Sequence, residues 1–309
     1  MLILLNPYSG GGRALEKWNR IQDEVNHRYD DPALRIVEET ERWDHLIQQS
    51  LAEGERNFVA AGGDGTVNIL LNALLTSTTL SQKGEITLGA IGLGSSNDFH
   101  KPFGSTEQIG GIPCRLNWQG ATSRDIGCLS YRDNDSIRSK YFISNASIGI
   151  TANANYFFNH PDRVLSHLKK HFVNGAIYYA ALYSIVKHRN IAVTIGSGIN
   201  HGEPVRLSNL AIIKNPHFSG SMRYAVLPDY QNKEFEIFSC HDMHRSDLVR
   251  LLYHCAHGGT NSLPNINSWK GDSLSVRAAT DFAVEYDGEI IRTTTCRFSI
   301  FPTSIKVCS

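Results

Sequence analysis

The chain has 309 residues, of which 41% are hydrophobic and 19% are charged. This balance supports a large core and excludes general disorder, and the length favours two domains over one. Lysine and arginine together number 30, as do aspartate and glutamate, so the formal net charge is zero. Because nucleic-acid binding draws on excess positive charge, we do not expect a nucleic-acid partner.

The cysteines and histidines show neither a disulfide framework nor a metal-binding pattern. The six cysteines contain no CxxC pair and the thirteen histidines no HExxH, so we expect reduced thiols in a cytoplasmic protein. Residues 1–5 are apolar but reach Asn6-Pro7 at once, which is too short for a signal peptide. The best apolar run, residues 176–186, is far below the roughly 18 residues of a membrane span, so any membrane contact should be peripheral.

In chain order, the first predicted unit is a buried strand over residues 2–5, followed by a glycine-rich turn and a helix. The turn reads Asn6-Pro7-Tyr8-Ser9-Gly10-Gly11-Gly12, and apolar residues follow it at helical spacing (Leu15, Trp18, Ile21 and Val25). A strand over residues 34–38 comes next, and Thr40 precedes a helix over residues 43–54. This alternation of strands and helices is typical of a parallel sheet.

The strongest local signal is the stretch from Phe58 to Leu75. A short apolar strand over residues 58–61 meets the turn Gly62-Gly63-Asp64-Gly65-Thr66, and a helix with one apolar stripe follows. The glycines allow a ligand to approach the backbone, and the N–H groups at the helix start favour an anion. Because Asp64 would repel a phosphate unless a cation lay between them, the turn predicts a metal-assisted phosphoryl site. The alternative is an ordinary turn in which Asp64 caps the helix.

A third turn of this kind follows a predicted strand over residues 86–93 and reads Gly94-Ser95-Ser96-Asn97-Asp98-Phe99. Each of the three turns ends a strand in small residues and hydroxyls. This pattern fits an open parallel sheet that binds ligands at the carboxyl ends of its strands. We therefore expect the three turns to converge on one cleft.

Near residue 122 the pattern changes from helical periodicity to short β-rich runs, which indicates an antiparallel sandwich or barrel. We predict an α/β domain over residues 1–122 and an all-β domain over residues 123–309. Two helical segments interrupt the second domain, one within residues 161–188 and one over about 246–257. The first contains Lys169, Lys170 and several tyrosines, which suit a helix at a membrane surface. A solvated helix that packs its aromatic residues inward is an equal alternative.

Four motifs in this order resemble the diacylglycerol kinase catalytic-domain family in its bacterial form, which is related to sphingosine and ceramide kinases. They are Asn6-Pro7-Tyr8-Ser9-Gly10-Gly11, Gly62-Gly63-Asp64-Gly65-Thr66 with Asn68, Leu93-Gly94-Ser95-Ser96-Asn97-Asp98-Phe99, and Asp287-Gly288-Glu289. The resemblance covers almost the full length. It implies a three-layer α/β/α nucleotide domain, similar to phosphofructokinase and NAD kinase, and an antiparallel β-sandwich domain. A return of the last strand, near residues 298–309, to the first domain stays open.

The resemblance implies an ATP- and Mg²⁺-dependent lipid kinase that transfers the γ-phosphate to a lipid hydroxyl, with diacylglycerol as the preferred acceptor. By matching positions, Asp64 and Asp98 would hold the metal, and Glu289 would take the proton from the hydroxyl with Asp64 as the second catalytic residue. The lipid would be met at a membrane surface, on its inner face. The residues implied to hold ATP are Asn6, Ser9, Gly10, Gly11, Thr40, Gly62, Gly63, Asp64, Gly65, Thr66, Val67, Asn68 and Ser95.

These residue types suit the chemistry, because phosphoryl transfer depends on positioning and charge neutralisation, and a carboxylate helps an alcohol to lose its proton. The alternative for Asp287-Gly288 is a β-hairpin turn, which does not exclude a catalytic Glu289. Two other functions stay open: a NAD kinase, which shares the Gly-Gly-Asp-Gly-Thr turn, and a nucleotide-binding regulatory protein without catalysis. The sequence resolves neither the lipid acceptor nor the oligomeric state, and a homodimer stays open.

One departure from the family concerns a second, structural Mg²⁺ ion. Within residues 228–237 the chain has Asn232-Lys233 where several relatives have Asp-Gly. Losing a carboxylate and gaining a neighbouring cation weakens divalent binding. We therefore do not predict this second metal site, whereas the transfer site looks intact.

Overall fold

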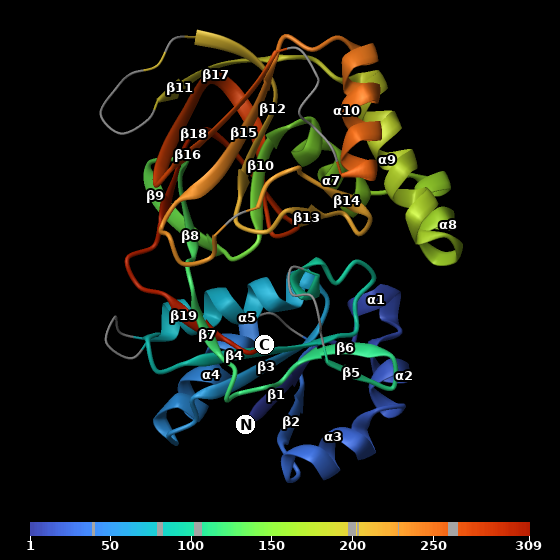
Figure 1. The fold of residues 1–309 in the computed structure, drawn as a ribbon, viewed down its shortest axis with the longest axis vertical. Coiled ribbons are helices and arrows are strands. Elements are labelled where there is room, and N and C mark those ends of the chain that lie inside the picture. Colours follow the sequence, from blue (N-terminus) through green and yellow to red (C-terminus); the bar gives the residue numbers. More distant parts are fainter. Residues whose placement is uncertain are drawn as a thin grey trace. The chain divides into compact units, whose positions relative to one another are not determined.

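The computed structural model describes residues 1–38, 41–78, 83–101, 107–196, 202, 204–227, 229–258 and 265–309. They form two compact units: unit 1 comprises Met1–Ile126 with Pro302–Ser309, and unit 2 comprises Gly127–Phe301 (Figure 1). The predicted boundary after residue 122 falls inside β7 (Thr122–Arg124), which pairs with β19 (Ile305–Val307). Because β19 also pairs with β4 (Thr87–Gly92), both strands belong to the sheet of unit 1, and the division comes only after Ile126.

Among the described residues, the sheet of unit 1 contains eight strands, and five successive strands, which begin at one edge and end with β19, are parallel. Their order is β2 (Ala33–Ile36), β1 (Leu2–Leu5), β3 (Asn57–Gly62) and β4, and β19 and β7 follow. A hairpin of β5 (Glu107–Ile109) and β6 (Ile112–Arg115) adds to β4 through β6. Every residue of β1 and β4 is buried, as expected for parallel strands covered on both faces.

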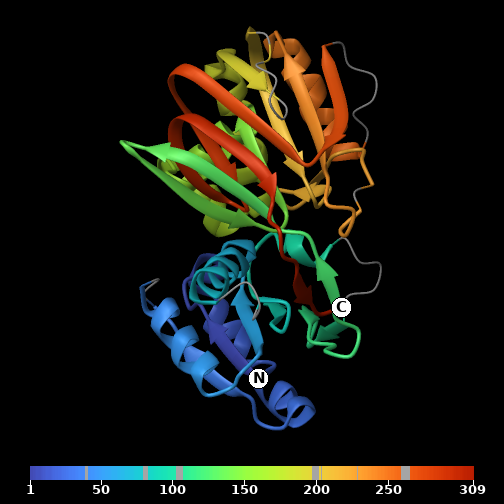
Figure 2. The same ribbon diagram turned by 90° about the vertical axis from the view of Figure 1, so that its left-hand side faces the viewer.

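Helices cover the sheet of unit 1 (Figure 2). On one face, α2 (Ala14–Asn19) and α3 (Gln22–Tyr29) share a buried core with Leu5 of β1 and Ala61 of β3. Elsewhere α5 (Asp64–Ser77) packs on β3 and β4, and α4 (Glu41–Ala52) packs on α5. The single helix predicted through Leu15 to Val25 is therefore divided into α2 and α3. A short glycine turn, α1 (Ser9–Gly12), precedes them.

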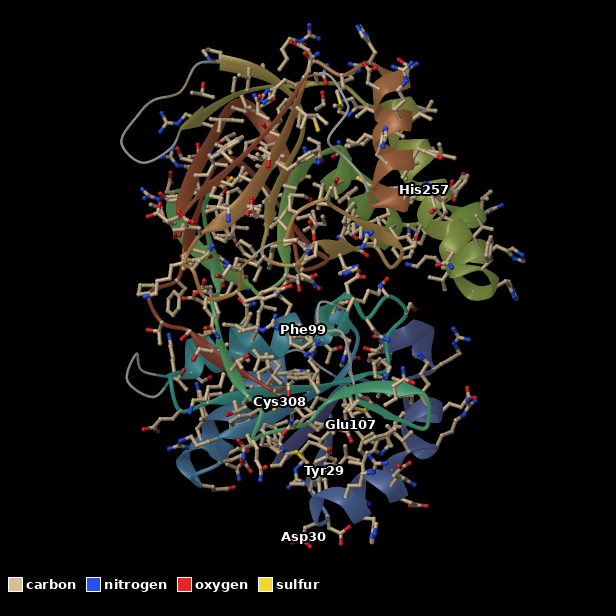
Figure 3. The ribbon with its side chains drawn as sticks, in the orientation of Figure 1. Tyr29, Asp30, Phe99, Glu107, His257 and Cys308 are labelled. Atoms are coloured by element: carbon tan, nitrogen blue, oxygen red, sulfur yellow. The ribbon has the colours of Figure 1, made fainter. Side chains whose placement is uncertain are left out.

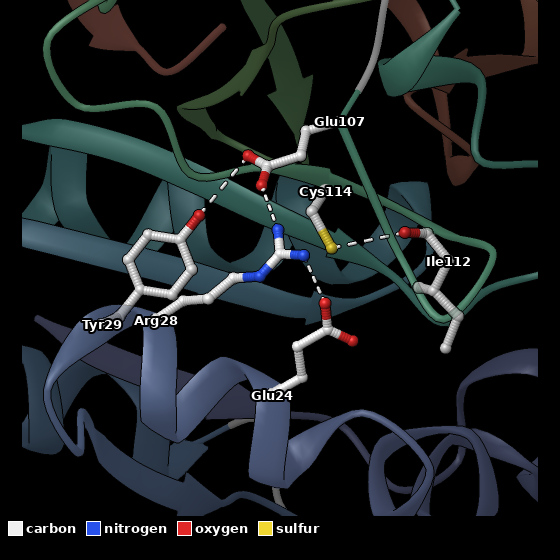
Figure 4. A network of polar contacts seen from close by, with 6 residues as sticks. All are labelled: Glu24, Arg28, Tyr29, Glu107, Ile112 and Cys114. Atoms are coloured by element: carbon white, nitrogen blue, oxygen red, sulfur yellow. Dashed lines mark hydrogen bonds and ion pairs between the residues drawn. The ribbon is translucent and has the colours of Figure 1, made fainter.

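A polar network ties α3 to β5 at the edge of unit 1 (Figure 4). One guanidinium nitrogen of Arg28 lies 2.7 Å from the Glu107 carboxylate, and another pairs with Glu24. The Tyr29 hydroxyl donates to Glu107 at 3.4 Å, and the Cys114 thiol donates to the carbonyl of Ile112 at 3.4 Å. Partial burial and the nearby carboxylate raise the pKa of Tyr29 to about 12. Exposed ion pairs add little stability, so this network chiefly orients the helix.

Unit 2 is β-rich, and nine of its described strands form one antiparallel sheet. The path runs β16 (Ile266–Gly271), β15 (Phe235–His241), β12 (Pro204–Ile213), β10 (Asn145–Gly149), β17 (Ser273–Tyr286), β18 (Glu289–Ile300), β8 (Gly127–Asp133) and β9 (Ser136–Phe142). The ninth strand, β11 (Ile191–Gly196), pairs with both β12 and β17. Two further short strands, β13 (His217–Phe218) and β14 (Met222–Arg223), pair with each other.

The sheet of unit 2 curls around its own core. Phe142 on β9 stacks on Phe235 of β15 with ring centroids 5.8 Å apart, although these strands lie near opposite ends of the sheet. Both rings are fully buried in one apolar cluster that draws residues from most of the strands. The nine strands are joined by hydrogen bonds into one sheet, since long strands such as β12 and β17 each pair along their length with more than one neighbour. The two-layer arrangement of the predicted sandwich stays a prediction.

Four described helices accompany this sheet: α7 (Ile150–Asn159), α8 (Arg163–His171), α9 (Val173–Lys187) and α10 (Arg245–His257). The helical segment predicted within residues 161–188 corresponds to α8 and α9, and the second predicted segment to α10. Helix α7 was not predicted, because the apolar strand preceding it runs without a break into Ile150. In the described part of the chain, each helix is too short or too polar to cross a membrane.

Candidate active site

Thr66 joins the first two glycine-rich turns. Its hydroxyl oxygen lies 2.9 Å from the Ser9 hydroxyl and accepts a hydrogen bond from the Asn6 amide at 3.2 Å. The backbone N–H of Gly63 donates to the Ser9 hydroxyl at 3.4 Å. These residues meet because β1 and β3 are adjacent parallel strands, so their carboxyl ends lie at the same edge of the sheet.

Close packing of glycines brings the third turn to the other two. A Cβ atom on Gly94 would lie 2.4 Å from the Cα of Gly63, and one on Gly10 would lie 2.6 Å from the carbonyl oxygen of Leu93. Any larger residue would therefore push the turns apart. Gly11, by contrast, has a positive φ of 72° and open space where a Cβ would lie, so its backbone stays accessible to a ligand.

Lys17 fixes the third turn from the side of α2. Its ammonium group donates to the carbonyl oxygens of Leu93 and Gly94 at 2.9 and 2.8 Å. Partial burial, and then the charges of Arg13 and Arg20, lower the pKa of Lys17. Sequence reasoning missed this residue, and its only local signal was a lysine soon after a glycine run.

Two carboxylates lie together in the site, on Asp64 and Asp98. One oxygen of Asp64 accepts the backbone N–H of Phe99 at 2.8 Å, which holds the start of α5 against the third turn. Burial, and then the charge of Asp98, raise the pKa of Asp64 to about 7. Asp98 also pairs with Lys101, with 2.6 Å between the ammonium and the carboxylate. Phe99 is buried in unit 1 beside the Arg115 guanidinium, 5.6 Å from its ring centre, and anchors this turn (Figure 3).

The chemistry of this pair of carboxylates would fit a magnesium ion. Mg²⁺ commonly binds through one or two carboxylates and completes its shell with water and phosphate oxygens. The repulsion that raises the pKa of Asp64 is relieved when a cation lies between the two groups. In the described part of the chain, no group of three or more acidic, histidine or cysteine side chains could hold a metal by itself.

The other residues that the sequence predicts to hold ATP differ in how exposed they are. Ser95 is exposed, whereas Val67 and Asn68 are each 3% exposed within α5 and face the protein interior. Gly62 ends β3, where a Cβ would collide with Thr66, and Gly65 lies in the first turn of α5. Thr40 lies outside the described residues.

In unit 2, Asp287-Gly288 forms the two-residue turn of the β17–β18 hairpin, in which Tyr286 pairs with Glu289. Both turn residues have positive φ, 44° and 93°, as this hairpin type requires. The Asp287 carboxylate accepts three backbone N–H groups, from Ile143, Ser144 and Asn145, at 2.8, 2.9 and 3.0 Å. Asp287 is thus a structural residue of the turn.

Glu289 is exposed, whereas Asp287 is buried. Glu289 lies at the first position of β18. Neighbouring atoms still shield the carboxylate enough to raise its pKa, an effect that the charge of Lys140 opposes. An accessible carboxylate of raised pKa on a rigid hairpin suits a general base.

Contacts to the Gly288 peptide hold this hairpin from both sides. The buried Glu285 carboxylate accepts the Gly288 N–H at 2.8 Å and the Ser147 hydroxyl at 2.7 Å. From α7, the side-chain amides of Asn155 and Asn159 donate to the Gly288 carbonyl at 3.1 and 3.0 Å. Sequence reasoning missed Glu285, Asn155 and Asn159, because none belongs to a motif and their contacts, apart from the one between Glu285 and Gly288, span more than a hundred residues.

We expect Glu285→Gln to stabilise the protein above neutral pH. Burial raises the pKa of Glu285 from 4.5 to about 7, so the folded state disfavours its ionised form. The wild type should therefore lose stability as pH rises from about 4.5 through about 7. The variant should not lose stability in this way, because the glutamine oxygen can accept the Gly288 N–H and its NH2 group can donate to the Ser147 hydroxyl. Urea unfolding at pH 5 and pH 8 should show the variant gaining up to about 3 kcal/mol over the wild type. Exposed Asp281→Asn is the control, and equal pH dependence in wild type and Glu285→Gln would contradict the assignment.

Comparison with known proteins agrees with this geometry. The family described as diacylglycerol kinase catalytic domain matches residues 1–127, close to the N-terminal part of unit 1. A probable lipid kinase YegS-like of Pseudomonas aeruginosa (strain UCBPP-PA14) is 23% identical over 281 residues, which cover 89% of this chain and 83% of that protein. A protein of the same name from Pseudomonas fluorescens (strain Pf0-1) is 35% identical over 69 residues, 22% of this chain and 21% of that protein.

Solved structures share the fold of both units. A diacylglycerol kinase from Bacillus anthracis str. Sterne has a TM-score of 0.68 at 15% identity, covering 99% of this chain and 95% of that one. Another structure from this organism has a TM-score of 0.74 at 17% identity, with 99% and 94% covered. The predicted combination of a mixed α/β part and a β-rich part is confirmed, as is the predicted resemblance. Residues 1–127 match the model of the diacylglycerol kinase catalytic-domain family, and the chain is similar to proteins named as lipid kinases.

Proposed function

We propose that this protein is an ATP- and Mg²⁺-dependent lipid kinase that transfers the γ-phosphate of ATP to a lipid hydroxyl, with diacylglycerol as the first acceptor to test. The observation that carries the proposal is the meeting of three glycine turns around Thr66, Gly94 and the Asp64–Asp98 pair at one edge of a parallel sheet. Such an edge is where open α/β sheets bind ligands. The match of residues 1–127 to the kinase family model supports the same reaction.

In this proposal the residues of unit 1 bind and orient the nucleotide. The open backbone at Gly11 and the N–H groups at the start of α5 would receive phosphate oxygens. Asp64 and Asp98 would hold Mg²⁺, which when bound neutralises charge on the phosphates. Thr66, Ser9 and Asn6 keep the first two turns in register. Glu289 of unit 2 would accept the proton of the acceptor hydroxyl.

Labelled-phosphate transfer from ATP to a panel of lipids in mixed micelles, with NAD as a further acceptor, tests this function. We expect a labelled phosphatidic acid or related lipid that requires Mg²⁺ and disappears in Asp64→Ala. A labelled NAD product would instead favour a NAD kinase. Binding of ATP without a product on any acceptor would favour a regulatory nucleotide-binding protein.

We also propose that the lipid is met at a membrane through α8 and α9. Residues 160–189 contain five lysines and arginines against one aspartate, although the whole chain is neutral. Exposed apolar side chains accompany them, with Phe172 60% and Val164 53% exposed. Lys169 lies over the ring of Phe158 and donates to the Phe158 carbonyl, whereas Lys170 is exposed. Basic and apolar side chains on one helical pair suit an anionic lipid surface.

Replacing Phe172 and Lys170 together by serine should weaken binding to vesicles by at least about tenfold, because the variant loses an inserted ring and a surface charge. Co-sedimentation with vesicles of phosphatidylglycerol and phosphatidylcholine measures this binding. Ile137→Ser, which removes an apolar side chain that is 79% exposed on β9, is the matched control. Equal loss in both variants, or unchanged binding in the double variant, would contradict the assigned surface.

A further inference from the structure

Lys214 is a fully buried lysine whose ammonium group is enclosed by one loop. It follows β12 directly and has no exposed surface. The ammonium donates to the backbone carbonyls of Asp229 and Glu234 at 2.7 and 2.9 Å, and to the side-chain oxygen of Asn232 at 3.3 Å. Burying a charge is costly unless polar partners replace water, and these oxygens are such partners.

The loop over residues 229–234 is folded so that its oxygens converge. The Asn232 side-chain oxygen that receives the ammonium also accepts the backbone N–H of Glu234 at 3.0 Å. The Asp229 carboxylate accepts the N–H of Gln231 at 2.8 Å, and Lys233 takes a positive φ of 57°. Backbone carbonyl and amide oxygens gathered from one short loop are the ligands that a hard cation such as Ca²⁺ or Mg²⁺ prefers. In this loop the cation that the oxygens contact is the ammonium group of Lys214.

The same loop contains Asn232-Lys233, the pair that made a second divalent ion unexpected. We propose that residues 229–234 form a cation site whose resident ion is the Lys214 ammonium, so that unit 2 folds without a divalent ion. The fixed charge of Lys214 would repel Mg²⁺ or Ca²⁺ from this loop, and the three oxygens named above, on Asp229, Asn232 and Glu234, are neutral carbonyl and amide oxygens. Removing the lysine side chain should open the site to an external alkylammonium ion. With a carboxylate at position 232, the site should also accept a divalent ion.

Thermal unfolding tests this site on the whole chain, by a readout that does not depend on kinase activity. The melting temperature of the wild type should change by less than about 2 °C between EDTA and millimolar Ca²⁺. Lys214→Ala should melt about 10 °C lower, because three oxygens of the loop lose their donor and the lysine stem leaves a buried space. Propylammonium, which matches the deleted atoms, should restore much of this loss, whereas 1-propanol and sodium chloride should not. In Lys214→Ala/Asn232→Asp, Ca²⁺ should raise the melting temperature by several degrees.

Lys270→Ala is the matched control, because Lys270 is an exposed lysine of the same unit that pairs with Glu236. It should melt close to the wild type and show no response to propylammonium. Hydrogen exchange of peptides spanning residues 226–240 should show that Lys214→Ala loses protection in this loop and that propylammonium restores it.

A wild type that Ca²⁺ stabilises by several degrees at this loop would overturn the proposal, even if Lys214→Ala does not fold. So would a Lys214→Ala protein that melts like the wild type. A Lys214→Ala protein that responds equally to propylammonium and 1-propanol would show that packing, and not charge, is what the lysine supplies.

Discussion

Asp64→Asn should reduce phosphoryl transfer by about 10³-fold while the protein stays folded. The change removes the negative charge that would hold Mg²⁺ beside Asp98, but an amide oxygen remains to accept the N–H of Phe99. Because burial and Asp98 already oppose ionisation of Asp64, the neutral side chain should leave the melting temperature unchanged or higher. Initial rates of labelled-phosphate transfer at saturating ATP, together with thermal unfolding, measure both effects.

The control for this variant is Asp44→Asn, which neutralises an exposed aspartate of α4 in the same unit. It should keep wild-type rates. If Asp64→Asn also keeps them, Asp64 has no part in the metal site. If Asp64→Asn unfolds, its carboxylate serves the turn rather than the reaction, and the hydrogen bond to Phe99 would be its main role.

Glu289→Gln should lower the turnover number by about 10²- to 10⁴-fold, the usual effect of losing a general base. Its Michaelis constant for ATP should hardly change, because the nucleotide residues lie in unit 1. The hairpin should also persist, since Asp287 and Glu285 hold it and Glu289 itself is exposed. In the wild type the rate should fall as pH drops below the raised pKa of Glu289, and this acidic limb should be absent in the variant.

Asp287→Ala provides a contrast to Glu289→Gln. It removes the acceptor of three backbone N–H groups, so it should lower thermal stability together with activity. A Glu289→Gln protein with the rate and pH profile of the wild type would show that another residue is the general base. One that loses stability as Asp287→Ala does would make Glu289 a structural residue.

The sequence by itself determined the local features of this protein. Glycine runs and the Asp287-Gly288 pair specify turns because few other residues adopt positive φ, and both predicted locations hold in the structure. The apolar run before the Gly62-Gly63-Asp64 turn predicts a strand over residues 58–61, and the strand is observed over Asn57–Gly62. A short apolar run that ends at a turn signal has few alternatives to a buried strand. The motif order was enough to predict the resemblance to the family whose model matches residues 1–127.

Only the tertiary structure decided which distant groups meet. The contact of Lys17 with the third turn spans 76 residues and that of Glu285 with Ser147 spans 138, and neither follows from a local pattern. The same holds for the pairing of β19 with β4, which assigns the end of the chain to unit 1. Lys214 reads in the sequence as an ordinary charged residue, and only burial among the oxygens of residues 229–234 makes it a resident cation. Turn geometry is local, whereas charge burial and its compensation depend on packing, and packing is a property of the whole fold.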